Sequence, residues 1–190
     1  DMNKMDFAHR ADTLAGKLAI CNVLRQMKVK YTLTKEMCVD PLSDSFKEDL
    51  RLFAGTCRVV TGMRKFNVGA IGARTTAFKT VRFDEIAFQS KRVNIETIDM
   101  TMVFDLMDAA DPVLMEAKKQ KLLEIADFGN WPAIKLENLA RLGVAIDKLI
   151  ADYDLQAIAI RCWNELQLRY GIAPCVLLGE LNERGIAAAC

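Results

Sequence analysis

The residues best suited to chemistry form a short polar segment near the end of the chain. Residues 161–165 read Arg-Cys-Trp-Asn-Glu and directly follow the apolar run 157–160, which is typical of a fully buried strand. Ligands of open α/β sheets collect outside the carboxyl ends of such strands, so Glu165 is a candidate for acid–base or metal chemistry. The structural alternative is that Glu165 only favours the dipole of a helix that begins there.

Two thiols, Cys162 and Cys175, could suggest nucleophilic catalysis. A catalytic cysteine needs an activating base, usually histidine, and the single histidine, His9, is remote in the sequence and expected at the surface. Glu165 is therefore the best reactive group. One carboxylate cannot form a divalent-metal site, because hard cations and Mn²⁺ take several oxygen or imidazole ligands. Further ligands would have to follow Cys190 or come from another subunit.

A second polar segment follows the apolar run 66–71, which predicts the first core strand. Arg74, Thr75 and neighbouring residues offer donors suited to hydroxyls, a carbonyl or an anion, although an ordinary polar loop is the commoner case. The glycines of 69–73 lack the GxGxxG spacing, so a dinucleotide site is disfavoured. Trp163 could stack on a sugar face, shield a pocket from water or lie in the core.

The elements that must position these residues follow from the periodicity of apolar positions. Strands are expected at 66–71, 93–98, 157–160 and 186–190, with helices at 82–90, 100–107, 111–127 and 132–153 and two more between the last two strands. This alternation predicts an α/β fold: a Rossmann-like parallel sheet with right-handed crossovers and helices on both faces. Glu96 and Asp99 end the second strand and could bind sugar hydroxyls, but Asp99 is expected to cap the next helix.

Residues 1–64 are dominated by helical patterns and predict an arm. Helices are expected at 8–28 and 45–63, the latter with Leu50, Phe53, Ala54 and Cys57 facing inward, and a short strand at 29–34. We therefore predict a single α/β domain with a helical arm, 1–64, and a parallel-sheet core, 65–190. The apolar strand that closes the chain suggests a piece of a longer polypeptide.

Composition narrows the function classes. Lys and Arg number 26 against 25 Asp and Glu, and this balance argues against a nucleic-acid surface, which needs clustered positive charge. The six cysteines form no CxxC pair, so a structural zinc site is disfavoured, and most are expected to be reduced and buried. The absence of a secretory segment favours the cytoplasm, and no apolar run reaches the ~20 residues needed to cross a bilayer.

Long stretches of the sequence resemble the L-fucose isomerase-like family, which is related to L-fucose and L-arabinose isomerases. The similar stretches are RCWNELQLRYGIAPCVLLGELNERGIAAAC, VGAIGARTTAFKTVRFDE, VNIETIDM and ADTLAGKLAICNVLRQMKVKYTL, and they occur in the same order. The resemblance covers nearly the whole chain and implies the central, Rossmann-like domain of such an enzyme.

The resemblance also implies an activity and a site. It implies an aldose–ketose isomerase that acts through an enediol, with Mn²⁺ or another divalent cation, a monosaccharide substrate and a homo-oligomer whose site lies between domains. Glu165 maps onto a metal ligand and is also the candidate base, while Arg74, Thr75 and Trp163 would face the substrate. The fragment alone is expected to be inactive. A non-catalytic sugar-binding or regulatory α/β domain is the alternative function, and a nucleotide-binding domain is a third.

Overall fold

The computed structural model describes residues 13–190, which separate into two compact units. One ends at Val60 and the other comprises Thr61–Cys190. His9 and the start of the helix predicted at 8–28 lie outside the described residues. The two units are taken one at a time below.

The first unit contains α1 (Thr13–Gln26) and most of α2 (Asp44–Gly62). Ser43 caps the start of α2, because its hydroxyl accepts a hydrogen bond from the backbone N–H of Phe46 over 3.2 Å. The inward face predicted for α2 is wrong, since Leu50, Phe53, Ala54 and Cys57 are all exposed. Neither helix buries a residue. Amphipathic spacing identified the apolar side of the helix, but no described segment packs against it.

The strand predicted at 29–34 is also wrong. This segment has no regular secondary structure in the chain as described, and Val29, Tyr31 and Leu33 are exposed. A strand needs a neighbour to satisfy its backbone groups, so alternation alone did not suffice. The end of the segment is instead held by a side chain: Lys17 of α1 donates to the hydroxyl of Thr34 over 2.5 Å. The residues that follow are held in the same way, since Lys17 also donates to the carbonyl of Met37 over 2.6 Å and the backbone N–H of Lys35 donates to Asp49 over 3.1 Å.

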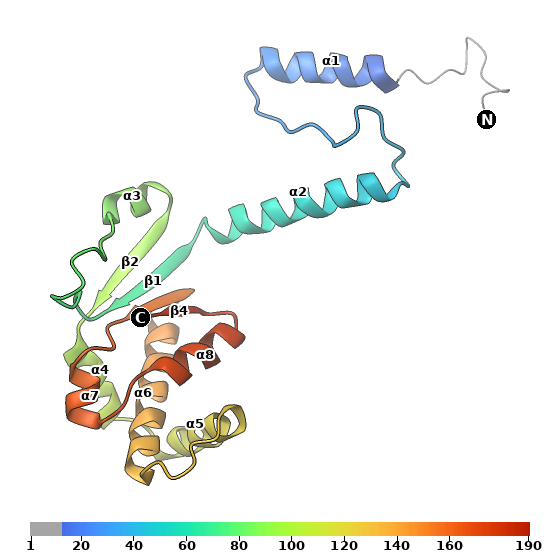
Figure 1. Cartoon of the computed structure of the whole chain (residues 1–190). Coiled ribbons are helices and arrows are strands. Elements are labelled where there is room, and N and C mark those ends of the chain that lie inside the picture. The colour runs from blue at the N-terminus through green and yellow to red at the C-terminus, as the bar shows by residue number, and fades with distance from the viewer. Residues whose placement is uncertain (1–12) are drawn as a thin grey trace. The chain divides into compact units, whose positions relative to one another are not determined.

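The second unit is an α/β layer structure built on a four-stranded parallel sheet, as predicted. The strands are β1 (Phe66–Ile71), β2 (Val93–Ile98), β3 (Ala157–Ile160) and β4 (Ala187–Ala189), in the spatial order β2-β1-β3-β4. All four were predicted, and β1, β2 and β3 have the predicted bounds. In Figure 1 the carboxyl ends of β1 and β2 point to the left of the view.

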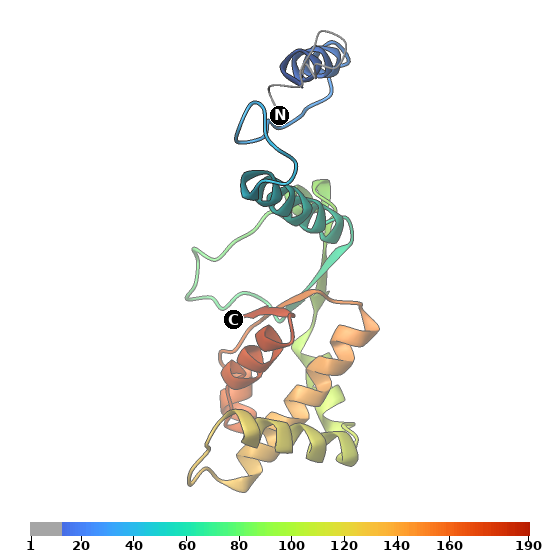
Figure 2. The same cartoon turned by 90° about the vertical axis from the view of Figure 1, so that its right-hand side faces the viewer.

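The helices of this unit agree with the predicted segments to within a few residues. They are α3 (Glu85–Ser90), α4 (Met100–Asp108), α5 (Pro112–Ile125), α6 (Ala133–Asp152), α7 (Glu165–Tyr170) and α8 (Cys175–Glu183). The chain crosses from β1 to β2 on one side and later returns past β1 to form β3 on the other side. When both crossovers are right-handed, their helices lie on opposite faces of the sheet. Figures 1 and 2 accordingly show α3 on one side of the sheet and α6 and α8 on the other.

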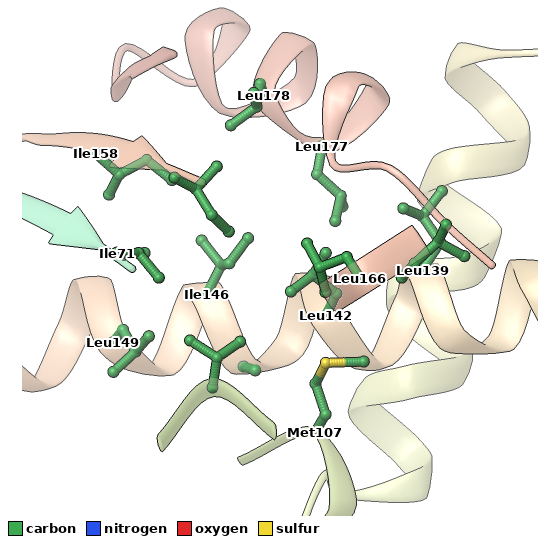
Figure 3. Close-up of a cluster of buried hydrophobic side chains, with 14 of the residues drawn as sticks. Ile71, Met107, Leu139, Leu142, Ile146, Leu149, Ile158, Leu166, Leu177 and Leu178 are labelled. Carbon is green, nitrogen blue, oxygen red and sulfur yellow. The ribbon is translucent and has the colours of Figure 1, made fainter. Parts of the chain in front are cut away.

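The hydrophobic core lies between the sheet and α6. The register aligns Ile71 of β1 with Ile98 and Ile160, and all three are buried. Figure 3 shows the aliphatic side chains that meet there, with Ile146 of α6 directed toward the strands. The spacing of apolar residues in 132–153 predicts that one side of this helix is buried, and all residues of that side except Ile150 are buried: Leu136, Leu139, Ala140, Leu142, Gly143 and Ile146. This core holds the strand ends, and so the loops beyond them, in fixed positions.

The cysteines differ from expectation. All six are free thiols and none is buried: Cys21 and Cys162 are half-buried and the other four are exposed. Two of the exposed ones, Cys38 and Cys57, lie in the first unit, whose two described helices bury no residue. Cys175 begins α8 at a surface position. None of the helices among residues 13–190 is long and apolar enough to cross a membrane.

Candidate functional site

The chain reverses its direction of winding between β1 and β3. It leaves β1 toward β2 and later returns on the other side of β1 to form β3. In open parallel sheets the crevice at such a point, outside the carboxyl ends of the two strands, is where ligands bind. Two segments follow the carboxyl ends of these strands: residues 72–84 after β1 and residues 161–164 after β3. All the predicted site residues lie in these two segments or at their ends.

Glu165 is the first residue of α7, at the end of the second segment. Its Oε1 is paired with the guanidinium of Arg161, and its Oε2 accepts a hydrogen bond from the backbone N–H of Asn164 over 3.0 Å. The side chain remains 37% exposed. Each carboxylate oxygen can accept more than one interaction, so both oxygens are oriented and each still has acceptor capacity for a ligand.

The backbone of Arg161 is hydrogen-bonded to the sheet. Its backbone N–H donates to the carbonyl of Ile71 over 2.8 Å, which extends the pairing of β3 with β1 by one bond. The side chain of Arg161 lies close to Gly72. If Gly72 had a Cβ atom, that atom would be 3.1 Å from the Cβ of Arg161. Gly72 has a φ of +79°, a conformation that glycine adopts without strain. The first residue after β1 therefore makes room for the first residue after β3.

The predicted substrate-facing residues of the first segment, Arg74 and Thr75, hold their own loop together. The guanidinium of Arg74 donates to the carbonyl of Phe78 over 3.2 Å. The carbonyl of Thr75 accepts the backbone N–H of Phe78 over 3.0 Å. Arg74 is exposed and Thr75 half-buried. These bonds close a turn that presents Phe78.

Phe78 and Trp163 join the two segments. Their ring centroids are 5.1 Å apart and the rings are inclined by 56°, a favourable geometry for aromatic pairs. Both side chains are about two-fifths exposed, at 43% and 44%. The core position considered for Trp163 is thus wrong. An exposed aromatic pair beyond the strand ends offers an apolar surface to a ligand.

The acids at the end of β2 have structural partners. Asp99 caps α4, accepting hydrogen bonds from the backbone N–H and hydroxyl of Thr101 over 2.7 and 2.6 Å, as predicted. These hydrogen bonds, and more weakly the positive charge of Arg161, hold the pKa of Asp99 below its usual value. Glu96 accepts a hydrogen bond from the side-chain amide of Asn94 over 2.5 Å.

The thiol of Cys162 lies beside that of Cys190, just after the paired ends of β3 and β4. Burial raises the pKa of the Cys190 thiol, and the neighbouring Cys162 raises it further through a hydrogen bond and charge repulsion. A raised thiol pKa means less thiolate at neutral pH and a weaker nucleophile. Cys190 thus lacks the activation that cysteine catalysis requires.

Glu165 fits a divalent cation as one ligand. Its hard carboxylate oxygens are what Mn²⁺ and Mg²⁺ select, and it is accessible at the crevice. Residues 13–190 contain no cluster of three or more His, Cys, Asp or Glu side chains arranged to hold a metal ion. Within the described residues, Glu165 is therefore not part of a complete set of three or more such ligands.

Sequence reasoning placed the site at strand ends but missed two of its relationships. The contact between Phe78 and Trp163 joins residues far apart in the sequence, and no local pattern signals it. The ion pair between Arg161 and Glu165 spans four positions, but Arg161 precedes α7, so helical spacing did not reveal it. The sequence signal for this ion pair was that Arg161 and Glu165 carry opposite charges at the two ends of one short loop after a strand.

Comparison with protein-family models gives a match over residues 1–64. The matching family is described as the fucose/sulfoquinovose isomerase N-terminal domain. The matched range ends just before β1 begins at Phe66. It thus covers the helical segment preceding the parallel sheet.

Curated relatives match almost the whole chain. The sulfoquinovose isomerases of Alkalicoccus urumqiensis and Clostridium sp. (strain MSTE9) are each 25% identical to it, over 94% and 95% of its length. The sulfoquinovose isomerase of Priestia aryabhattai is 22% identical over 95% of the chain. The chain spans about 40% of the length of each of these relatives. The predicted resemblance to the fucose isomerase-like family is confirmed.

Proposed function

We propose that this chain is part of a metal-dependent aldose–ketose isomerase and carries one of its metal ligands, Glu165. The observation that carries the proposal is the placement of Glu165: an accessible carboxylate with both oxygens oriented, beyond the carboxyl end of β3, which neighbours β1. The relatives named as sulfoquinovose isomerases support a monosaccharide substrate. We extend the proposal to a homo-oligomer in the cytoplasm on the family resemblance.

The two units have separate roles in this proposal. We assign residues 1–64 to the end of an N-terminal domain, because this range matches the N-terminal domain model. The matched range also ends close to Val60, where the first compact unit ends. We assign residues 65–190 to the opening of the central, Rossmann-like domain. The remaining metal ligands would come from parts of the protein other than residues 1–190. These residues alone are then expected to bind Mn²⁺ weakly and to be inactive.

The chemistry divides between the cation and the residues of this chain. A bound divalent cation would supply Lewis-acid polarisation of the sugar carbonyl. Glu165 is the candidate to take the C2 proton and return it to C1 by way of an enediol, because its carboxylate is exposed to the crevice. Arg74 and Thr75 would donate to sugar hydroxyls, and Trp163 would cover the apolar face of the sugar. The aromatic pair would also exclude water from the exchanging proton.

The test is turnover by the full-length protein with Mn²⁺ on a panel containing fucose, arabinose and sulfoquinovose. Glu165→Gln is compared with the wild type and with Glu183→Gln, which removes an exposed carboxylate from α8. We expect Glu165→Gln to lose at least about a hundredfold in turnover, the scale of a lost acid–base group, and Glu183→Gln to retain activity. Turnover that is indifferent to Glu165 would reject its assigned role.

A non-catalytic sugar-binding or regulatory domain is the second candidate. The exposed pair of Phe78 and Trp163 favours it, since an aromatic wall binds the apolar face of a sugar without a metal. In that case the full-length protein binds sugars, with or without Mn²⁺, and interconverts none of them. Isothermal titration of the same sugar panel, run beside the turnover assay, separates the two candidates.

A further inference from the structure

Arg161 is the cation in contact with Glu165. Its guanidinium NH2 group pairs with Oε1 of the carboxylate, and the pair is partly shielded, with side-chain exposures of 22% for Arg161 and 37% for Glu165. A partly shielded ion pair is weakened less by solvent and salt than a fully exposed one. The positive charge that a metal cation would bring to Glu165 is already provided by this guanidinium.

The Cα and Cβ atoms of Arg161 are held in place, whereas its guanidinium lacks one hydrogen-bond partner. The backbone bond to Ile71 and the close approach to Gly72 fix the Cα and Cβ atoms. The Nε atom is buried and has no hydrogen-bond partner. A buried donor without an acceptor costs free energy, which a rearranged guanidinium could recover by finding one. In its observed position the guanidinium of Arg161 therefore gains an ion pair with Glu165 but leaves Nε without a hydrogen bond.

We propose that Arg161 is a positioning residue that pairs with Glu165 in the metal-free protein and is displaced from it when a divalent cation binds. The guanidinium and the cation compete for one carboxylate, and they repel each other at short range. Arg161 then keeps Glu165 oriented before the cation arrives and weakens the affinity for that cation. This inference rests on the proposed role of Glu165 as a metal ligand.

The opposite role is a permanent scaffold. If Arg161 only orients Glu165 and stays in place, its removal disorders the carboxylate and weakens cation binding. The competing role predicts the reverse sign, because removal eliminates a competing positive charge. The sign of one affinity change therefore distinguishes the two roles.

The experiment is isothermal titration of Mn²⁺ into the chelator-treated full-length protein, at low and at high ionic strength. Arg161→Gln is expected to bind Mn²⁺ about tenfold more tightly than the wild type at low ionic strength, with a smaller gain at high ionic strength. Arg161→Lys keeps the charge and is expected to stay close to the wild type. Arg169→Gln is the matched control, because it removes a cation from α7 that packs over Phe104, at 4.5 Å from the ring centroid. Equal or weaker binding by a folded Arg161→Gln would overturn the proposal.

A second variant keeps the test decisive if Arg161→Gln is poorly folded. Arg161→Met keeps an unbranched side chain at this position but removes the charge. It is expected to bind Mn²⁺ more tightly than the wild type at low ionic strength, for the same reason as Arg161→Gln. Unchanged or weaker binding by a folded Arg161→Met contradicts the proposal. If the wild type binds no Mn²⁺, or binds it equally well with Glu165→Gln, the metal role of Glu165 itself fails. If Glu165→Gln weakens Mn²⁺ binding but the Arg161 variants leave it unchanged, the metal role of Glu165 stands and the displacement of Arg161 is rejected.

Discussion

Gly72 and Arg161 are in contact at the crevice, and the contact depends on the missing side chain of Gly72. A Cβ atom at this position would be 3.1 Å from Cβ of Arg161 and 2.9 Å from Cγ of Met100. Gly72 also has a φ of +79°, in the left-handed region. The ends of β1 and β3 can be this close only because the first residue after β1 is glycine.

Gly72→Ala is expected to destabilise the protein by roughly 1–3 kcal/mol, because it adds backbone strain and two close contacts. Gly179→Ala is the matched control. Gly179 lies in α8, and a Cβ atom there meets nothing within 4 Å. That control is expected to stabilise the protein by about 0.5–1 kcal/mol through helix propensity. Urea unfolding followed by circular dichroism measures both, and a Gly72→Ala variant as stable as the wild type would refute the close contact.

The pair of Phe78 and Trp163 predicts a spectroscopic change. Phe78→Leu removes a ring centred 5.1 Å from the Trp163 ring. In protein labelled with 5-fluorotryptophan, we expect the ¹⁹F resonance of Trp163 to shift, with a loss of stability below about 1 kcal/mol because both rings are partly solvated. The resonance is assigned by its disappearance in Trp163→Phe.

The control for that experiment is Phe83→Leu. Phe83 is also exposed and aromatic, but its ring neighbour is Phe88, at 6.3 Å between centroids. Its substitution is expected to leave the Trp163 resonance in place. Equal shifts in both variants would mean that the loop after β1 does not hold Phe78 against Trp163.

A buried ion-pair cluster joins three helical segments and predicts a pH dependence. Glu180 of α8 is 1% exposed and pairs with Lys118 at 3.5 Å, Lys121 at 2.8 Å and Arg184 at 3.0 Å. Burial alone would raise the pKa of Glu180, but hydrogen bonds from Lys121 and Arg184 and the charges of Lys118 and Arg184 outweigh it, so the pKa lies below its ordinary value. Ionised Glu180 therefore stabilises the folded state.

Because the folded-state pKa of Glu180 is lowered, its contribution is present above the ordinary glutamate pKa and lost as pH falls through the folded value. Glu180→Gln is expected to destabilise the protein by roughly 2–4 kcal/mol at neutral pH, with Asp147 still available to Lys118 at 2.5 Å. It should also flatten the decline of stability below about pH 4.3. Glu183→Gln on the same helix should do neither. Urea unfolding from neutral to acidic pH tests this, and an unchanged acid slope in Glu180→Gln would contradict it.

Much of the parallel-sheet unit could be predicted from sequence. Apolar runs gave the bounds of β1, β2 and β3, and the stripe that includes Leu139 and Ile146 predicted the buried side of α6. Asp99 was recognised as a cap because its oxygen bonds to a backbone group only two residues away. These features depend on neighbours in sequence, so local patterns contain the relevant information.

The first unit shows where the same reasoning fails. The apolar residues of α2, such as Phe53, were predicted to face inward, yet they are exposed. The segment 29–34 alternates like a strand but is not one in the described structure. Periodicity identifies a face that can be buried. Whether it is buried depends on another segment that covers it.

The sequence by itself determined the parallel α/β class, the polar strand-end segments and the choice of Glu165 as the carboxylate to test. Only the tertiary structure decided that β1 and β3 are neighbours, that Arg161 pairs with Glu165, and that Phe78 meets Trp163. The reason is physical. Strand and helix formation follow from interactions over a few residues, whereas strand order and contacts between loops are set by crossovers and packing between segments distant in the chain.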